Sequence, residues 1–275
     1  MFSSIERSWK LAQQSWALLM KDKELLLFPV LSGVTVLLVM ASLILPTAAL
    51  GLWTQARIGF PLFIPAFFFY FVSSTIVIFF NAAMVSAVQI RMRGGDPTLM
   101  DGLRGAWRRI GSILAYAAIA ATVGLILRML RERGGVMGRI AAFFGGLGWA
   151  LATYVAVPVL VAEGVGPIDA IQRSARLIRN TWGHQVAGHV GFGLVQTLVG
   201  LAIVVACAPL VALSIQGGFW PLTVAVGALG VAALVTSTII FSALTTIYQT
   251  AVHRYAVTGD VYGFDGQLLE GGASS

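Results

Sequence analysis

The chain alternates between short stretches in which apolar and polar residues recur with a helical period and long stretches that are apolar throughout. Residues 171–182 form the clearest stretch of the first kind. With successive residues about 100° apart around a helix, its apolar side chains fall on one face and its polar side chains on the other. These faces are Ile171, Ala175, Ile178 and Trp182 against Arg173, Arg176 and Asn180.

The same pattern occurs twice more, nearer the N-terminus. Residues 5–16 align with residues 171–182 without a gap, and the identical pairs are Ile5/Ile171, Arg7/Arg173, Ser8/Ser174, Leu11/Leu177 and Trp16/Trp182. A weaker third copy sets Leu103, Trp107, Ile110 and Leu114 against Arg108 and Ser112. Amphipathic helices with cations on one face and tryptophan at the boundary are typical of membrane surfaces. The alternative, a helix on a soluble core, is disfavoured by the apolar stretches that follow each copy.

A pair of long apolar stretches follows each amphipathic stretch. A transmembrane helix needs roughly 17–25 apolar residues, and the stretches that meet this need are residues 24–45, 61–90, 112–128, 139–162, 185–213 and 221–248. The chain is therefore predicted to be an all-α polytopic membrane protein, with six transmembrane helices in three repeats of a cytoplasmic amphipathic helix plus a transmembrane hairpin. We expect one membrane domain over residues 1–275, with repeats at 1–96, 97–166 and 167–258 and a loose tail at 259–275.

Composition supports the membrane interpretation and argues against nucleic acid as a partner. Only 11% of the residues are charged and 58% are apolar, whereas a soluble domain is about 25% charged. The net charge of +7 would suggest nucleic acid as a partner in a soluble chain, but nearly all the cations flank apolar stretches, where they set membrane orientation. The single cysteine, Cys207, lies in an apolar stretch, so we expect neither a disulfide framework nor a cysteine-based metal site. We expect no cofactor.

The distribution of Lys and Arg predicts the orientation. Thirteen of them lie in the two terminal segments and in the connections on the same side of the predicted membrane as the termini. The other five lie in the connections on the opposite side. By the positive-inside rule, both termini and all three amphipathic helices are predicted to be cytoplasmic. Residues 128–139 carry four arginines on the predicted outer side. Either this connection is an exception to the rule, or the two spans beside it do not fully cross the membrane.

One segment resembles a known family. The relevant residues are Pro158, Glu163, Gly164, Ala170, Arg173, Ser174, Leu177 and Trp182. Their spacing resembles the membrane region of some bacterial glycerophosphoryl diester phosphodiesterases and related stand-alone six-helix membrane proteins. The resemblance covers about 25 residues and implies a fold with no settled activity. We expect the chain to lie in the bacterial cytoplasmic (inner) membrane. The soluble phosphodiesterase domain is absent, so the resemblance does not carry that activity to this chain.

The amphipathic stretches hold the candidate surface-binding residues. Candidate contacts to lipid headgroups are Arg7, Lys10, Arg108, Arg173 and Arg176, and candidate interfacial anchors are Trp9, Trp16, Trp107 and Trp182. The alternative is that the cations only set topology. Glu163 precedes the third amphipathic stretch, and we expect it to form a structural ion pair with Arg173 rather than to act in catalysis.

Polar residues within the apolar stretches are candidates for a path through the bundle. They are Asn81, Ser242, Thr245, Thr246 and Tyr248. Such groups are costly in a bilayer and often functional, although hydroxyls also bond to their own helix. His184 and His189 are five residues apart, about 140° around a helix, so we expect no metal site there.

Two classes of function follow. We predict an integral membrane protein without a catalytic site that interacts with membrane lipids, with itself or with another membrane protein. The alternative is an oligomeric channel or transporter for a small solute or lipid, which predicts that Asn81 and Thr245 face one shared cavity. A membrane hydrolase rests on the resemblance alone.

Overall fold

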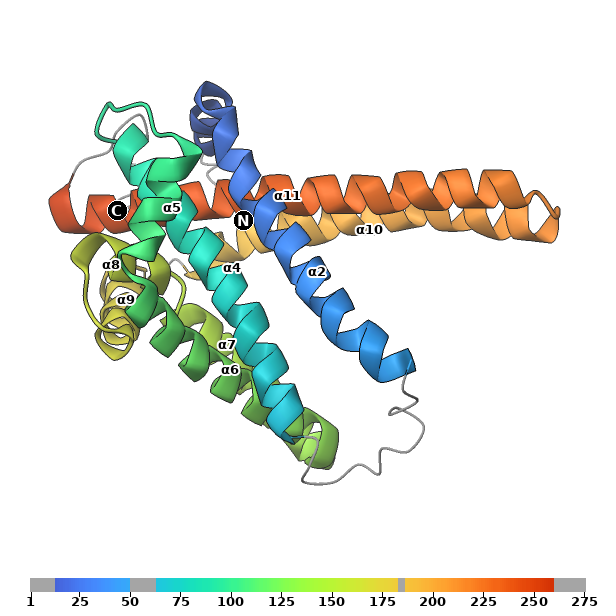
Figure 1. The fold of residues 1–275 in the computed structure, drawn as a ribbon, viewed down its shortest axis with the longest axis horizontal. Coiled ribbons are helices and arrows are strands. Elements are labelled where there is room, and N and C mark those ends of the chain that lie inside the picture. Colours follow the sequence, from blue (N-terminus) through green and yellow to red (C-terminus); the bar gives the residue numbers. More distant parts are fainter. Residues whose placement is uncertain (1–12, 50–62, 183–185, 260–275) are drawn as a thin grey trace.

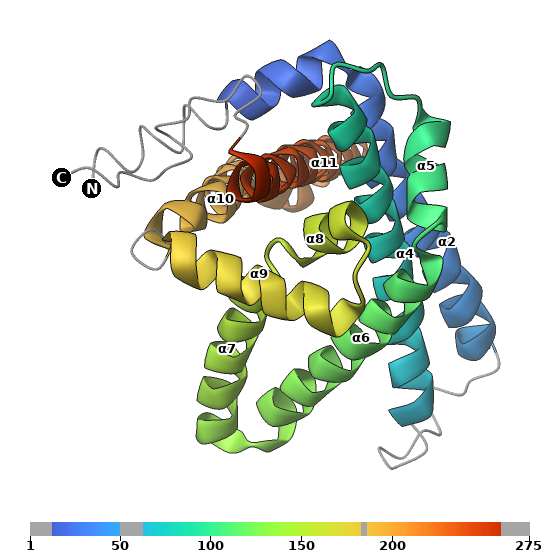
Figure 2. The ribbon, with the colours of Figure 1, turned by 90° about the vertical axis from the view of Figure 1, so that its left-hand side faces the viewer.

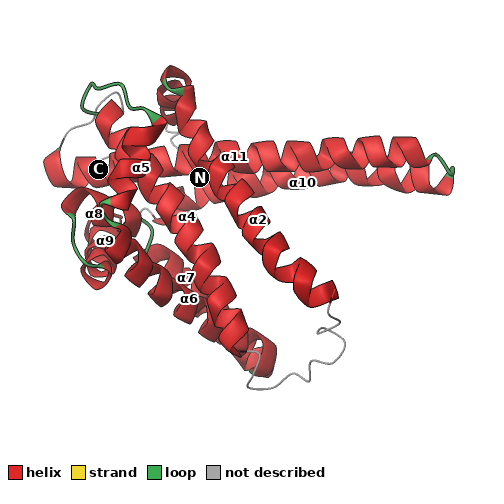
Figure 3. Ribbon diagram, in the orientation of Figure 1, coloured by secondary structure: helices red, strands yellow, loops and turns green. Residues whose placement is uncertain are grey.

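The computed structural model describes residues 13–49, 63–182 and 186–259. These residues are almost entirely helical and contain no strand (Figure 3). A helix over residues 13–21 precedes the short 3-10 helix η1 (Lys23–Leu26). The α-helices that follow are α2 (Leu27–Ala49), α4 (Phe63–Arg91), α5 (Leu99–Trp107), α6 (Ile110–Arg133), α7 (Gly135–Ala152), α8 (Ala156–Glu163), α9 (Pro167–Trp182), α10 (Val186–Gln216) and α11 (Trp220–Thr258).

The described part of the chain holds six segments that are long and apolar enough to cross a membrane. They are Lys23–Ser42, Phe67–Arg91, Ile110–Arg133, Gly135–Glu163, Val195–Gln216 and Trp220–Thr258. The predicted number of segments long and apolar enough to span a membrane is therefore confirmed. Helices suit such sequences because each backbone N–H and C=O is satisfied within its own segment.

The amphipathic segments gather at one end of the molecule. The helix over residues 13–21, α5 and α9 lie around α8 and the last turns of α11 (Figures 1 and 2). The main hydrophobic core is also at this end, where Phe28, Met84, Leu160, Ile247 and Tyr248 are buried. Away from it the spans diverge, and the α10–α11 hairpin points away from α2, α4, α6 and α7 (Figure 1).

Close approach between α4 and α5 requires glycine. A Cβ atom at Gly102 would lie 2.7 Å from the carbonyl oxygen of Ala83 and would also meet the ring of Phe28. A Cβ atom at Gly105 would overlap Ser86. The α5 helix therefore lies directly on α4.

Three predicted boundaries are wrong. α11 continues to Thr258, beyond the predicted end of the sixth span at residue 248. The weaker amphipathic copy at residues 103–114 is divided between two helices, because α5 ends at Trp107 and α6 begins at Ile110. Residues 128–139 are helical except around Gly134, since arginine-rich sequence can extend a helix beyond its apolar section.

Candidate functional site

The fourth span is two helices, although the sequence predicts one. α7 ends at Ala152, α8 begins at Ala156, and residues 153–155 form a turn. Pro158 explains the break, because proline has no N–H to donate to the carbonyl four residues earlier and its ring crowds that carbonyl. Thr153 reinforces the turn, since its hydroxyl donates a 2.8 Å hydrogen bond to the carbonyl oxygen of Trp149. The break places Thr153 and Tyr154 at the junction of two helices.

Helix α9 holds both ends of α8. The Val155 N–H, at the beginning of α8, donates a 3.1 Å hydrogen bond to the hydroxyl of Ser174, which is fully buried. At the other end, the guanidinium of Arg173 pairs with the carboxylate of Glu163. Adjacent residues of α9 therefore contact the beginning and the last residue of a short, mostly buried helix.

A third group completes the carboxylate site at the end of α8. His253 of α11 is 4% exposed, and its Nε2 lies 3.0 Å from Oε1 of Glu163. Gly164 ends α8 with φ of +65°, and the guanidinium of Arg109 lies where a Cβ atom at Gly164 would be. Glu163 thereby joins α8 to α9 and α11. Because its two oxygens are occupied by Arg173 and His253, the geometry favours a structural role.

The sequence does not single out His253, because the apolar stretch of the sixth span ends at residue 248. A signal was available in the spacing of Thr246, Thr250 and His253, which recur at intervals of four and three residues. This spacing places them on one helical face. All three are buried.

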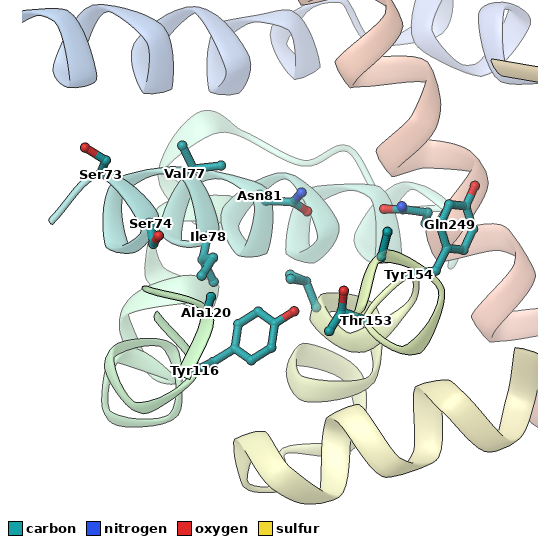
Figure 4. A pocket seen from close by; sticks show the side chains of 12 residues that line it. Ser73, Ser74, Val77, Ile78, Asn81, Tyr116, Ala120, Thr153, Tyr154 and Gln249 are labelled. Carbon is teal, nitrogen blue, oxygen red and sulfur yellow. The ribbon is translucent and has the colours of Figure 1, made fainter. Parts of the chain in front are cut away.

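A polar cavity lies at the other end of α8, beside the break. Its volume is about 460 Å³, within the range of small-molecule sites. Its lining comes from α4, α6, α7, α8, α11 and the turn at 153–155, and consists of Ser73, Ser74, Val77, Ile78, Asn81, Tyr116, Ala120, Ala150, Thr153, Tyr154, Val157 and Gln249. Figure 4 shows Asn81 on one side of this space, Tyr116 and Thr153 on the other, and Gln249 beside Tyr154.

The polar side chains of the cavity differ in how they are satisfied. Tyr116 interacts with the hydroxyl of Thr153, and Tyr154 interacts with the side chain of Gln249. The amide oxygen of Asn81 is buried and has no hydrogen-bond partner among the described residues. An unpaired buried amide oxygen is costly, so this atom is suited to accept a hydrogen bond from a ligand.

The residues of the predicted polar path do not all meet at this cavity. Thr246 and Tyr248 are buried in the core, and the Thr246 hydroxyl donates to the carbonyl oxygen of Ser242 at 3.0 Å. Thr245 is not among the lining residues, whereas Gln249 lies there with Asn81. The path itself stays a prediction.

The predicted surface residues have several environments. Arg7, Trp9 and Lys10 lie outside the described residues, as does His184, and the side chains of Trp182 and His189 are also outside the description. Trp16 and Trp107 are 44% and 67% exposed. Arg108 and Arg176 are exposed, while Arg173 pairs with Glu163. Among the described residues, no group of His, Cys, Asp and Glu could hold a metal ion.

A second ion pair joins the N-terminal segment to α4. Asp22 is 6% exposed and lies 3.2 Å from Arg91, which also contacts Asp96 at 2.6 Å. The Leu99 N–H donates to the carboxylate of Glu24 at 3.3 Å. These contacts fix the first amphipathic segment beside α5.

The described residues form an all-α fold with six segments that are long and apolar enough to cross a membrane. The chain belongs to DUF6159, a family of unknown function, which matches residues 61–264. This match includes α8, α9 and the cavity. Neither curated proteins nor solved structures give a match. The comparisons show no link to glycerophosphoryl diester phosphodiesterases, so that resemblance stays a prediction.

Proposed function

We propose that the chain is a non-catalytic, lipid-interacting integral membrane protein of the bacterial cytoplasmic membrane. Its six long helices cross the bilayer as three repeats of an amphipathic segment plus a hairpin. Both termini and the amphipathic segments face the cytoplasm. The observation that carries this proposal is the common location of the helix over residues 13–21, α5 and α9 at one end of the bundle (Figure 2).

Exposed cations at that end support contact with anionic lipids. They are Lys21, Lys23, Arg104, Arg108, Arg176 and Arg179. Each basic residue near an anionic leaflet contributes about 1 kcal/mol to the interaction. The exposed rings of Trp16 and Trp107 suit the interface between headgroups and acyl chains.

Cysteine labelling tests the orientation. In a Cys207→Ala background, we expect a membrane-impermeant maleimide to label Met137→Cys in intact cells and Met100→Cys only after permeabilisation. Met137 begins the outer section of α7 and Met100 lies on α5, and both side chains are exposed. Labelling of both variants from the same side would show that α6 does not cross the membrane.

Native mass spectrometry tests the lipid contact. We expect the Arg108→Gln, Arg176→Gln, Arg179→Gln triple variant to retain less phosphatidylglycerol than the wild type. An Arg131→Gln variant serves as the control, because Arg131 lies at the opposite end of α6. Equal phosphatidylglycerol in all three proteins would contradict the headgroup role.

A conduit is the second candidate function, and the polar cavity favours it. A conduit would need the groups around Asn81 to contact a moving solute. Solute flux in proteoliposomes, measured with the wild type and with Asn81→Leu, tests this idea. Flux that Asn81→Leu abolishes would support a conduit, and absence of flux in both samples would exclude it for the solutes used.

A further inference from the structure

We propose that the cavity beside the α7–α8 break binds the polar end of an uncharged lipid with a free hydroxyl group, of the diacylglycerol class. The proposal rests on the membrane location given above, but not on its orientation or on the basic surface. It depends on the lining chemistry, the unpaired oxygen of Asn81 and the position of the lining residues within the candidate spans.

The lining selects against a charged headgroup. Among the described residues that form the cavity, the polar groups are hydroxyls and carboxamides, and none is charged. A phosphate placed there would lose its hydration without gaining a cation, which is strongly unfavourable. An uncharged headgroup carries no such penalty.

The unpaired oxygen of Asn81 specifies a hydrogen-bond donor. Its Oδ1 is buried within the cavity wall and accepts no hydrogen bond from the described residues. A ligand hydroxyl can donate to this oxygen, whereas an ester or ketone oxygen cannot. The ligand must therefore carry at least one hydroxyl or similar N–H or O–H group.

The remaining lining and its location favour a lipid over a soluble polyol. Apolar side chains of Val77, Ile78 and Val157 alternate with the polar groups, so the cavity also suits methylene groups. The lining residues belong to the candidate membrane spans, Phe67–Arg91, Ile110–Arg133, Gly135–Glu163 and Trp220–Thr258. A molecule dissolved in the bilayer reaches this depth more readily than one dissolved in water.

The surrounding contacts hold the cavity lining in place before a ligand binds, so the site is preorganised. The α7–α8 turn presents Thr153 and Tyr154 to the cavity, and Ser174 and Arg173 of α9 fix the two ends of α8. A site held in this way loses little conformational entropy when a ligand binds.

Photocrosslinking in reconstituted vesicles tests the proposal. The full chain is placed in phosphatidylcholine vesicles that contain a trace of diacylglycerol with a diazirine on one acyl chain. After illumination, peptide mapping should place the label on α4, α6 or the segment around residue 154. Phosphatidic acid with the same diazirine chain should label these peptides at least roughly fivefold less.

Variants separate the cavity from general contact with lipid. Asn81→Leu and Tyr116→Phe should each lower diacylglycerol labelling roughly fivefold, the effect of one lost hydrogen bond. Thr122→Val is the matched control on α6, because its exposed hydroxyl bonds only the carbonyl of Ala118 at 2.8 Å in its own helix. Labelling in this control should equal that of the wild type. Tyr116→Phe removes one oxygen atom, so it keeps the test valid if Asn81→Leu fails to fold.

Four results would overturn the proposal. They are unchanged labelling in both cavity variants, label confined to other helices, equal labelling by phosphatidic acid, and full competition by free glycerol, which would indicate a soluble polyol. Flotation of the vesicles on a density gradient is measured in parallel. If the protein does not float with lipid, the membrane location itself is wrong, and this outcome is distinct from failure of the cavity site.

Discussion

Helix α4 and the α10–α11 hairpin are both highly apolar, yet they pack very differently. In the most apolar part of α4, 44% of residues are buried, compared with 6% in α10 and 6% in α11. The hairpin exposes large side chains such as Leu201, Val205 and Leu229 on its outer surfaces. Apolarity alone therefore does not determine which helices of this chain associate.

Both regions use small residues or polar contacts, but α4 packs on several helices whereas α10 packs chiefly on α11. α4 contacts α5 through Ala83, Gly102 and Gly105, and contacts α8 and α11 in the shared core. Within the hairpin, the Gly230 backbone approaches Cys207, and Ser214 and Thr223 lie 2.8 Å apart near the turn. Lipid tails are as apolar as leucine, so close packing and hydrogen bonds drive association between membrane helices. The comparison teaches that the amphipathic end is the structural centre of the molecule.

Substitution of a helix-contact glycine should have the largest effect on this centre. We expect Gly102→Ala to lower the free energy of unfolding by about 1–3 kcal/mol, because the new methyl group overlaps the Ala83 carbonyl and Phe28. Gly227→Ala in the hairpin is the control, since no atom lies within 4 Å of its Cβ position. That change should stabilise the protein by about 0.5–1 kcal/mol. Thermal unfolding in detergent measures both, and equal destabilisation would contradict the comparison.

Loss of the Glu163 ion pair should have the second largest effect on the free energy of unfolding. Glu163→Gln removes the charge that pairs with Arg173 and His253, and we expect a loss of about 1–2 kcal/mol, moderated by the partial exposure of Arg173. Glu132→Gln is the control, because its pair with Arg128 is exposed and lies at the opposite end of the bundle. It should change stability by less than about 0.5 kcal/mol. A larger loss for Glu132→Gln than for Glu163→Gln in chemical unfolding would be inconsistent with this ranking.

A hydroxyl group should contribute to stability only where it forms a hydrogen bond with another helix. Ser174→Ala leaves the Val155 N–H without its partner, and we expect a loss of about 1 kcal/mol. Thr197→Ala in α10 removes a hydroxyl that bonds Gly193 of its own helix, and should be nearly neutral. Hydrogen exchange should quicken at Val155 in the first variant alone. Unchanged exchange there would show that Ser174 does not hold the break.

The sequence predicts the spans well, because the length and apolarity that a membrane requires are local properties. The contact between Glu163 and Arg173 is also foreseeable, since both residues flank one short connection. The α7–α8 break is harder to predict, because Pro158 leaves the hydropathy of the stretch unchanged. The meeting of Asn81 with Gln249 has no local signal at all, since it depends on how distant helices pack. His253 was missed because the end of α11 carries fewer apolar residues.

The smallest expected effect on stability comes from changing Asp101, which caps the beginning of α5. The Thr98 hydroxyl and backbone N–H both donate to Asp101, at 2.6 and 3.1 Å, and these bonds lower the pKa of Asp101 below its ordinary value of 3.8. Because the folded pKa is depressed, this stabilisation is complete above the ordinary pKa and is lost as the pH falls through the lower, folded value.

Hydrogen exchange of backbone amides can detect this local loss of stability at the beginning of α5. At neutral pH, amides in the first turn of α5 should exchange faster in Asp101→Asn than in the wild type, because the amide accepts these bonds more weakly than the carboxylate. The difference should shrink as the pH falls below the folded pKa, where the wild-type side chain is also uncharged. Asp169→Asn is the matched control, since it changes a first-turn carboxylate of α9 and should leave α5 unaffected. A difference that persists at low pH would show that the Asp101 charge is not what holds this turn.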